Sequence, residues 1–177
     1  MRKHYDKNTA SPQTKVNILT LVSAEQQTHN FYKAHGLMYA NPTLRKLYAE
    51  IGDVEEEHVS MYESLMEPTE TIFEKLLLHE FTEVCNYYTC MQQETNEHFK
   101  KIWEEFLSYE IDHLHSAAKL LQKHENKDAE EVIGNTIIEP NKFLSQKDYI
   151  AKILREQSDL RLTDGKDIGY TKKRRTS

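Results

Sequence analysis

The sequence predicts an all-α protein built around a bundle of four long helices. The 177 residues include only five Gly and four Pro, about 5% of the chain where roughly 12% is usual. Few of these residues mean few tight turns and long uninterrupted elements. Apolar side chains also recur at alternating steps of three and four along four consecutive stretches, which is the pattern of helices that bury one side. We therefore do not expect a β-sandwich or a nucleotide-binding fold with a Gly-rich loop.

The first two helices are delimited by prolines. Ser11 followed by Pro12 reads as an N-cap and a proline in the first helical position. Pro42 ends the first pattern and Pro68 ends the second, because proline cannot continue a helix. The predicted helices span about residues 12–39 and 43–66.

The third and fourth helices follow without another proline. Thr71 and Glu74 have the spacing of a capping box, which marks a helix start. The predicted helices span about residues 71–93 and 96–125.

The chain divides into a bundle domain and an extension. Residues 12–125 form the four-helix domain, preceded by a polar segment, 1–11, that we expect to be frayed. Residues 126–177 form a C-terminal extension with a short amphipathic piece at 128–134, one helix at about 145–159 and a basic, disordered tail.

Charge and composition exclude several classes of function. Lys and Arg number 23 against 29 Asp and Glu, a net charge of −6, whereas nucleic-acid binding requires a basic face. No apolar run is long enough for a membrane span, and the first residues do not resemble a signal peptide. Cys85 and Cys90 cannot form a disulfide framework and are expected to be inert. We expect a cytoplasmic protein that binds neither nucleic acid nor membrane.

Carboxylates interrupt the apolar side of all four predicted helices. An unpaired buried carboxylate costs several kcal/mol, so this recurrence needs a common cause, and metal ions supply one. Two Glu-x-x-His motifs place a carboxylate and an imidazole one turn apart on the same side of a helix. Each motif is preceded by another Glu thirty residues earlier. The resulting ligand set is Glu25, Glu55, His58, Glu80, Glu110 and His113.

The ligand set repeats within the chain at an offset of 55 residues. Glu25 corresponds to Glu80, and His58 corresponds to His113. An internal repeat on this scale implies a pseudo-twofold axis through a symmetric site.

With these motifs, residues 12–125 resemble the ferritin-like di-iron carboxylate superfamily and, within it, the rubrerythrin branch. Those proteins use one Glu from each of two helices and a Glu-x-x-His from each of the other two. The resemblance implies that Glu25 and Glu80 are terminal ligands, that Glu55 and Glu110 bridge two iron ions, and that the two histidines supply nitrogen. Manganese is the alternative metal.

Three further residues have implied roles. Glu83 lies where rubrerythrins carry a seventh ligand, although it is also placed to be a solvent-facing acid. Tyr32 and Tyr87 correspond to the tyrosines that flank the rubrerythrin site, with either a redox role or a packing role. His29 is expected to support the site or the core without binding metal.

The resemblance implies a peroxidase that acts against oxidative stress by reducing hydrogen peroxide or dioxygen. The chain has no Cys-x-x-Cys pair and hence no rubredoxin module, so electrons must come from a separate donor protein. Three alternatives remain open: a manganese catalase-like enzyme, a ferroxidase or iron-storage protein, and a structural metal-binding module.

The short link between the second and third helices predicts a homodimer. In a ferritin-like bundle these helices run the same way, which requires a crossing of about 25 Å here. Residues 66–71 span at most about 18 Å. We therefore expect a domain-swapped dimer in which each site takes three ligands from each chain, with an up-down-up-down monomer as the competitor.

Overall fold

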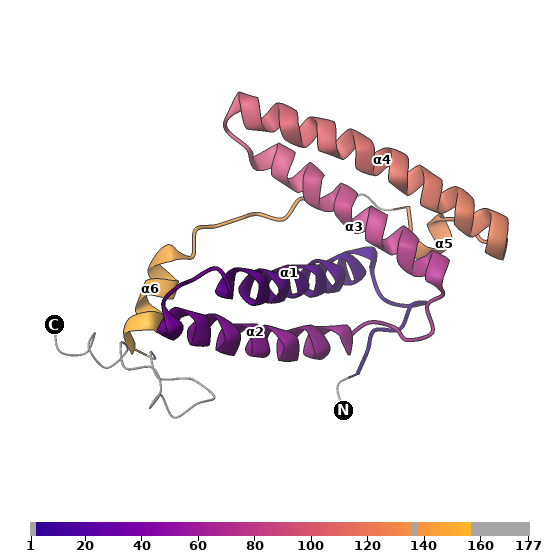
Figure 1. The fold of residues 1–177 in the computed structure, drawn as a ribbon. Coiled ribbons are helices and arrows are strands. Elements are labelled where there is room, and N and C mark those ends of the chain that lie inside the picture. Colours follow the sequence, from indigo (N-terminus) through magenta and orange to yellow (C-terminus); the bar gives the residue numbers. More distant parts are fainter. Residues whose placement is uncertain (1–2, 136–137, 157–177) are drawn as a thin grey trace.

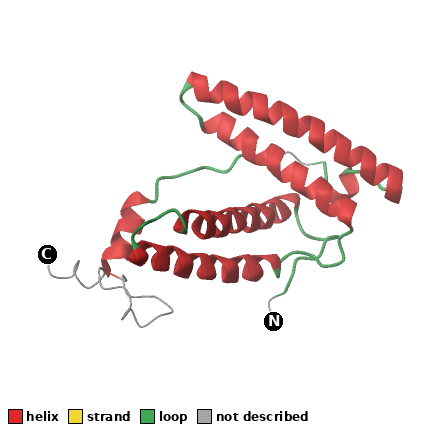
Figure 2. Cartoon of the chain, viewed as in Figure 1, coloured by secondary structure: helices red, strands yellow, loops and turns green. Residues whose placement is uncertain are grey.

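The computed structural model describes residues 3–135 and 138–156, and this part of the chain is helical with no strand (Figure 2). The predicted all-α class is confirmed. Within the same residues, no helix combines the length and the apolar character that crossing a bilayer requires.

The four long helices form two antiparallel hairpins (Figure 1). Packing is most extensive inside each hairpin, and the hairpins touch each other through α1 and α3. We call α1 with α2 hairpin 1, and α3 with α4 hairpin 2. The predicted bundle domain is thus two hairpins within one chain. The helices are α1 (Pro12–Gly36), α2 (Pro42–Glu63), α3 (Ile72–Gln93) and α4 (Glu97–Glu125).

Side-chain caps explain where the helices begin. The Ser11 hydroxyl accepts a hydrogen bond from the Thr14 backbone amide at 3.2 Å. Thr71 and Glu74 form the predicted capping box, with amide-to-side-chain distances of 3.1 and 2.8 Å. Each cap satisfies backbone amides that have no partner inside the helix.

The ends of α1 and α2 differ from the prediction by about three residues, whereas α3 and α4 end where they were predicted to end. α1 ends at Gly36 instead of residue 39, and glycine is costly to hold in a helix. α2 ends at Glu63 instead of residue 66. There the Ser64 hydroxyl donates to the Met61 carbonyl at 2.7 Å, and such bonds compete with helix propagation.

The extension begins with a short helix and ends in a second one. α5 (Glu130–Ile133) lies within the amphipathic piece expected at 128–134. α6 (Lys147–Glu156) lies within the range expected for the last helix, 145–159. The last residues of that expected helix and the basic tail lie outside the described residues. The segment before α6 is held to the end of α3, because Gln93 bonds the carbonyl of Asn141 and the amide of Phe143.

The apolar core lies at one end of the molecule, where α3, α4 and α5 meet. Leu19 of α1 packs against it from hairpin 1. The buried members are Leu77, Leu78, Ala117, Leu121 and Val132.

The N-terminal segment is packed and not frayed, which corrects the expectation for residues 3–11. Tyr5 is buried, and its backbone amide donates to the Leu65 carbonyl at 2.9 Å. Its hydroxyl donates to Glu70 at 2.5 Å. One aromatic ring with a polar tip thus fixes an otherwise polar segment to the α2–α3 connection.

Buried charged groups cluster beneath this segment. Lys15 is 3% exposed, and its ammonium donates to the carbonyls of Lys7 at 3.0 Å and Val132 at 2.8 Å. Glu74 is 2% exposed and accepts from Lys7 at 3.1 Å and from Lys127. We name Tyr5, Lys15, Glu70, Glu74 and Lys127 the hinge cluster, because it lies where the two hairpins join.

Candidate metal centre

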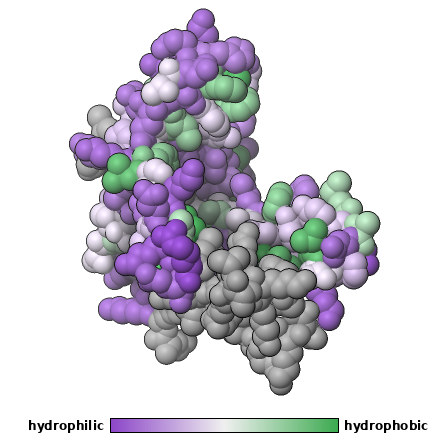
Figure 3. Space-filling model, turned by 90° about the vertical axis from the view of Figure 1, so that its left-hand side faces the viewer, coloured by the Kyte–Doolittle hydropathy of each residue, from purple (hydrophilic) through white to green (hydrophobic). Residues whose placement is uncertain are grey.

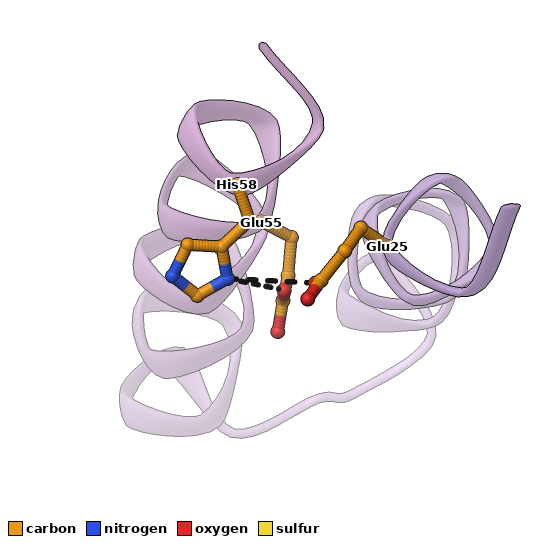
Figure 4. Close-up of side chains that lie close together, drawn as sticks. All are labelled: Glu25, Glu55 and His58. Carbon is orange, nitrogen blue, oxygen red and sulfur yellow. Dashed lines mark hydrogen bonds and ion pairs between the residues drawn. The ribbon is translucent and has the colours of Figure 1, made fainter. Parts of the chain in front are cut away.

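Three predicted ligands come together in hairpin 1. Glu25 extends from α1 toward Glu55 and His58 of α2 (Figure 4). The Nδ1 atom of His58 lies 3.1 Å from the Glu55 carboxylate and 3.4 Å from the Glu25 carboxylate. One ligand atom from each residue lies within 4.8 Å of the other two. We call these residues the first triad.

Hairpin 2 repeats the arrangement with Glu80 of α3 and with Glu110 and His113 of α4, which we call the second triad. Nδ1 of His113 lies 3.0 Å from the Glu110 carboxylate and 3.8 Å from the Glu80 carboxylate. The 4.8 Å limit holds here as well. The 55-residue repeat therefore produces two like groups of ligands.

Aromatic packing holds the helices of each hairpin together beyond the triads. In hairpin 1 the rings of Tyr32 and Tyr48 meet edge to face at 5.3 Å. In hairpin 2 the rings of Tyr87 and Phe106 do the same at 5.7 Å. These pairs link the two helices of each hairpin, and aromatic pairs add about 0.5–1.5 kcal/mol beyond the area they bury.

The triads are half open to solvent. The four carboxylate side chains are 15–21% exposed, whereas the side chains of His58 and His113 are 40% and 59% exposed. The sides of the helices that carry these ligands were predicted to face a closed bundle core. In one chain they therefore stay partly accessible to solvent. Another surface, or solvent, must cover the imidazoles.

The electrostatics of the triads favour a bound cation. A hydrogen bond with the Glu55 carboxyl, together with burial, raises the pKa of Glu25. In hairpin 2 a hydrogen bond with the Glu110 carboxylate raises the pKa of His113. Both shifts have the same cause, which is the concentration of negative charge at the site. A bound divalent ion would neutralise the same negative charge without added protons.

The donor atoms fit the metals expected from the sequence. Each triad offers two carboxylates and one imidazole, a mixture of oxygen and nitrogen that suits iron or manganese. The two triads share no residue and lie on different hairpins. The six ligands therefore form two separate groups of three in one chain.

Glu83 and the two predicted tyrosines lie around the triads and not within them. Burial raises the pKa of Glu83, and the charges of Glu110 and Glu80 add to the effect. Burial, with the charge of Glu83, also raises the pKa of Tyr87. Tyr32 is half-buried between the rings of Phe31 and Tyr48. Glu83 is thus close enough to sense the second triad electrostatically.

His29 links two helices in hairpin 1, as its placement outside the ligand set predicted. Its Nδ1 lies 2.9 Å from the Gly52 carbonyl across the α1–α2 seam. The two cysteines are half-buried. Burial raises the pKa of Cys85 to about 11 and that of Cys90 as well, which keeps both thiols protonated and unreactive.

Sequence reasoning missed the hinge cluster. Its acids and lysines read as ordinary surface charges, because no periodic apolar pattern surrounds residues 67–74. The capping box at Thr71 was the one available signal, since its Glu74 is the acid at the centre of the cluster.

Comparison of the chain with models of protein families, with curated proteins and with solved structures gave no significant match. The functional argument therefore depends on the triads themselves.

Proposed function

We propose that the protein is a non-haem di-iron oxidoreductase, a rubrerythrin-like peroxidase that reduces hydrogen peroxide or dioxygen with electrons from a separate donor protein. The observation that carries the proposal is the pair of matched triads, each with two Glu and one His within 4.8 Å. Two carboxylates this close repel each other, and a bound cation would relieve that repulsion.

A second copy of the chain would complete the di-metal site. The first triad of one copy and the second triad of another together supply four carboxylates and two imidazoles, the set expected of this class of protein. A homodimer is the smallest assembly that provides it.

The residues of the chain hold the metals and balance their charge. Two ferrous ions would supply the two electrons that convert one hydrogen peroxide and two protons into two waters. Glu55 and Glu110 would bridge, and Glu25 and Glu80 would occupy the terminal positions. Glu83 would offset the positive charge that the site gains on oxidation, because uncompensated charge is costly in a low-dielectric surrounding.

Metal analysis and a visible spectrum test the proposal. The protein is purified without oxygen, loaded with ferrous ion, and treated with peroxide in the presence of a reduced artificial donor. We expect two metals per chain, a spectral change on oxidation, and turnover of the donor. Glu110→Ala should lose most of the metal, whereas Glu104→Ala, an exposed acid on the same helix, should keep it.

Other results would select the alternatives. Oxygen evolution from the manganese-loaded protein without a donor indicates a catalase. Oxidation of many ferrous ions per chain inside a large shell indicates storage. A site that keeps its redox state in peroxide indicates a structural role.

A second candidate is a pair of independent mononuclear sites, one per hairpin, which the separation of the triads favours. Electron paramagnetic resonance separates the two arrangements. Two neighbouring ferric ions couple and lose the signal of isolated high-spin iron, whereas independent ions retain it.

A further inference from the structure

The end of hairpin 1 that joins α1 to α2 carries a pair of tyrosines. The hydroxyls of Tyr39 and Tyr48 lie 3.1 Å apart in a hydrogen bond, and the centroids of their rings are 4.9 Å apart. The planes of the two rings are inclined at 57°. The ring carbons that flank each hydroxyl therefore lie close to the other ring. These carbons are the positions at which two oxidised tyrosine rings form a carbon–carbon bond.

The backbone holds the pair in place. The Arg45 guanidinium donates to the Tyr39 carbonyl at 2.9 Å, and Asn41 caps the start of α2 two residues further on. Tyr48 lies against the end of α1, where a Cβ atom added to Gly36 would be only 2.9 Å from the Tyr48 Cβ. The two rings are therefore positioned before any reaction, which lowers the entropy cost of joining them.

Tyr48 also belongs to a row of phenol rings that begins near the first triad. Tyr32 lies seven residues after Glu25 on α1, and Tyr48 lies seven residues before Glu55 on α2. Seven residues make about two helical turns, a rise of about 10.5 Å, and return to the same side of the helix. The two rings meet across the seam at 5.3 Å. The row continues from Tyr48 to Tyr39.

The outer end of this row is open to solvent. Tyr39 is 37% exposed, and the preceding Leu37 and Met38 are 81% and 78% exposed. Figure 3 views the molecule from the left-hand side of Figure 1, where α1 ends and α2 begins, and shows apolar patches among hydrophilic residues. An oxidising equivalent that reaches this end has left the neighbourhood of the metal ligands.

Hairpin 2 repeats only part of the row. The rings of Tyr87 and Trp103 lie 6.0 Å apart. Trp103 stands at the repeat position of Tyr48, and Glu94 stands at that of Tyr39. The tyrosine pair is therefore specific to hairpin 1.

We propose that Tyr39 and Tyr48 are an oxidative modification site, at which hydrogen peroxide acting at the metal-loaded first triad joins the two rings as a dityrosine. Each phenol gives up one electron and its hydroxyl proton, and the two radicals form one carbon–carbon bond. The hydrogens on the bonded carbons then move to the phenol oxygens as the rings become aromatic again. One hydrogen peroxide takes up the two electrons and two protons and becomes two waters.

The proposal rests on the proposed function for its oxidant and adds a site to it. Peroxide reduction needs two electrons, which the separate donor protein supplies in ordinary turnover. When that donor is absent, the tyrosine pair supplies them and confines the oxidation to one place at the surface of hairpin 1.

Dityrosine fluorescence and peptide mass test the proposal in the whole chain. Protein loaded with ferrous ion is treated with hydrogen peroxide without a donor. We expect dityrosine emission, the loss of two hydrogen atoms from the mass of the chain, and a covalent link between residues 39 and 48. A reduced artificial donor should suppress the link, because it supplies the electrons instead.

The failures of the two proposals are distinguishable. Peroxide consumption by the iron-loaded protein with no such link, or with links between separate chains only, would overturn the modification site and leave the proposed function standing. A chain that takes up no iron, or that leaves peroxide unreacted, would overturn both.

Matched variants make the test specific. Tyr39→Phe and Tyr48→Phe should each abolish the link, whereas Tyr149→Phe, which changes an exposed tyrosine on α6, should keep it. Glu55→Ala with His58→Ala should prevent the link in iron and peroxide. Light-driven oxidation with a ruthenium complex and persulfate needs no metal site, so it should still form the link in that double variant. A link that forms equally well in the double variant with iron and peroxide would show oxidation by free iron and overturn the proposal.

Discussion

Two acids of the hinge cluster, four residues apart, have opposite electrostatic surroundings. Burial alone would raise the pKa of Glu74, but hydrogen bonds from Lys127, the Thr71 amide and Lys7 hold that pKa at about 2. Burial raises the pKa of Glu70, although the Tyr5 hydroxyl and Lys15 oppose the effect. One oxygen of Glu70 is also buried without a hydrogen-bond partner. Glu74 therefore stabilises the fold as an anion, whereas Glu70 is costly in that form.

Replacing Glu74 by Gln should destabilise the protein in a pH-dependent way. The folded-state pKa is below the unfolded value, so the carboxylate contributes stability above about pH 4.5 and loses it as the pH falls toward 2. At pH 7 we expect a loss of about 3 kcal/mol, shrinking as the pH approaches 2. Urea unfolding of both proteins across this range measures the difference. Glu104→Gln is the exposed control, and a pH-independent difference would contradict the assignment.

Replacing Glu83 by Gln should change chemistry without changing metal content. The substitution keeps the shape of the side chain and removes the charge that would favour the oxidised site. Peroxide turnover with an artificial donor should fall at least about tenfold, equivalent to about 1.4 kcal/mol in the barrier. Unaltered kinetics in a fully metal-loaded variant would assign Glu83 to packing alone.

Among the elements, hairpin 1 depends on two close approaches between its helices. A Cβ atom on Gly36 would lie 2.9 Å from the Tyr48 Cβ, which is fixed to its backbone. A Cβ atom on Gly52 would lie 3.0 Å from the Lys33 Cε, which is near the end of a flexible side chain. The first contact cannot relax without moving a helix, and the second can.

We expect Gly36→Ala and Gly52→Ala to change stability in different directions. Alanine gains about 1 kcal/mol of helix propensity at a helical glycine. Overpacking at Gly36 costs about 1–3 kcal/mol, so that variant should be less stable. Displacing Lys33 weakens only an exposed ion pair with Asp53, worth about 0–1 kcal/mol, so Gly52→Ala should be neutral or more stable. Chemical unfolding of the whole chain, followed by circular dichroism, compares them. Equal losses in both variants would contradict the packing argument.

The starts of the elements were predictable from sequence, and some of their ends were not. The caps of α1 and α3 form local hydrogen bonds, which can be recognised from the neighbouring residues Ser11 and Pro12, and Thr71 and Glu74. The end of α2 depends on the Ser64 hydroxyl, which donates to the Met61 carbonyl, and no sequence pattern predicts this hydrogen bond. The packing of residues 3–11 depends on the long-range hydrogen bond from Tyr5 to Glu70. The polar residues around Tyr5 gave no indication in the sequence that this ring is buried.

At the scale of the whole molecule, the composition of the triads was predictable and their relation to each other was not. Glu-x-x-His spacing fixes neighbours on one helix, and the 30-residue interval matches positions across an antiparallel hairpin. Which sides of α1 and α3 meet depends on Thr20, Asn86 and the hinge cluster. These are polar residues whose contacts leave no periodic signal.

Lys15 links α1 to the N-terminal segment and to α5, so its replacement should lower the stability of the whole molecule. In Lys15→Met the side chain keeps its length, but the buried carbonyls of Lys7 and Val132 lose their donor. Leaving buried acceptors unsatisfied costs about 1–3 kcal/mol. We expect a loss of about 2 kcal/mol in global stability and faster proteolysis after Lys7. Lys119→Met, exposed on α4, is the control, and equal proteolysis in both variants would contradict the role of Lys15.

The hairpin arrangement also has a consequence for folding kinetics. Contacts inside each hairpin join neighbours in sequence, whereas the Thr20–Asn86 bond closes a chain segment of 66 residues. Local contacts form first, because closing a longer loop costs more entropy. Hairpin 1 should therefore fold while hairpin 2 is still being synthesised, and the first triad should exist before the second. A ribosome-bound chain from which α2 has fully emerged would already present a carboxylate-rich face to metal ions in the cell.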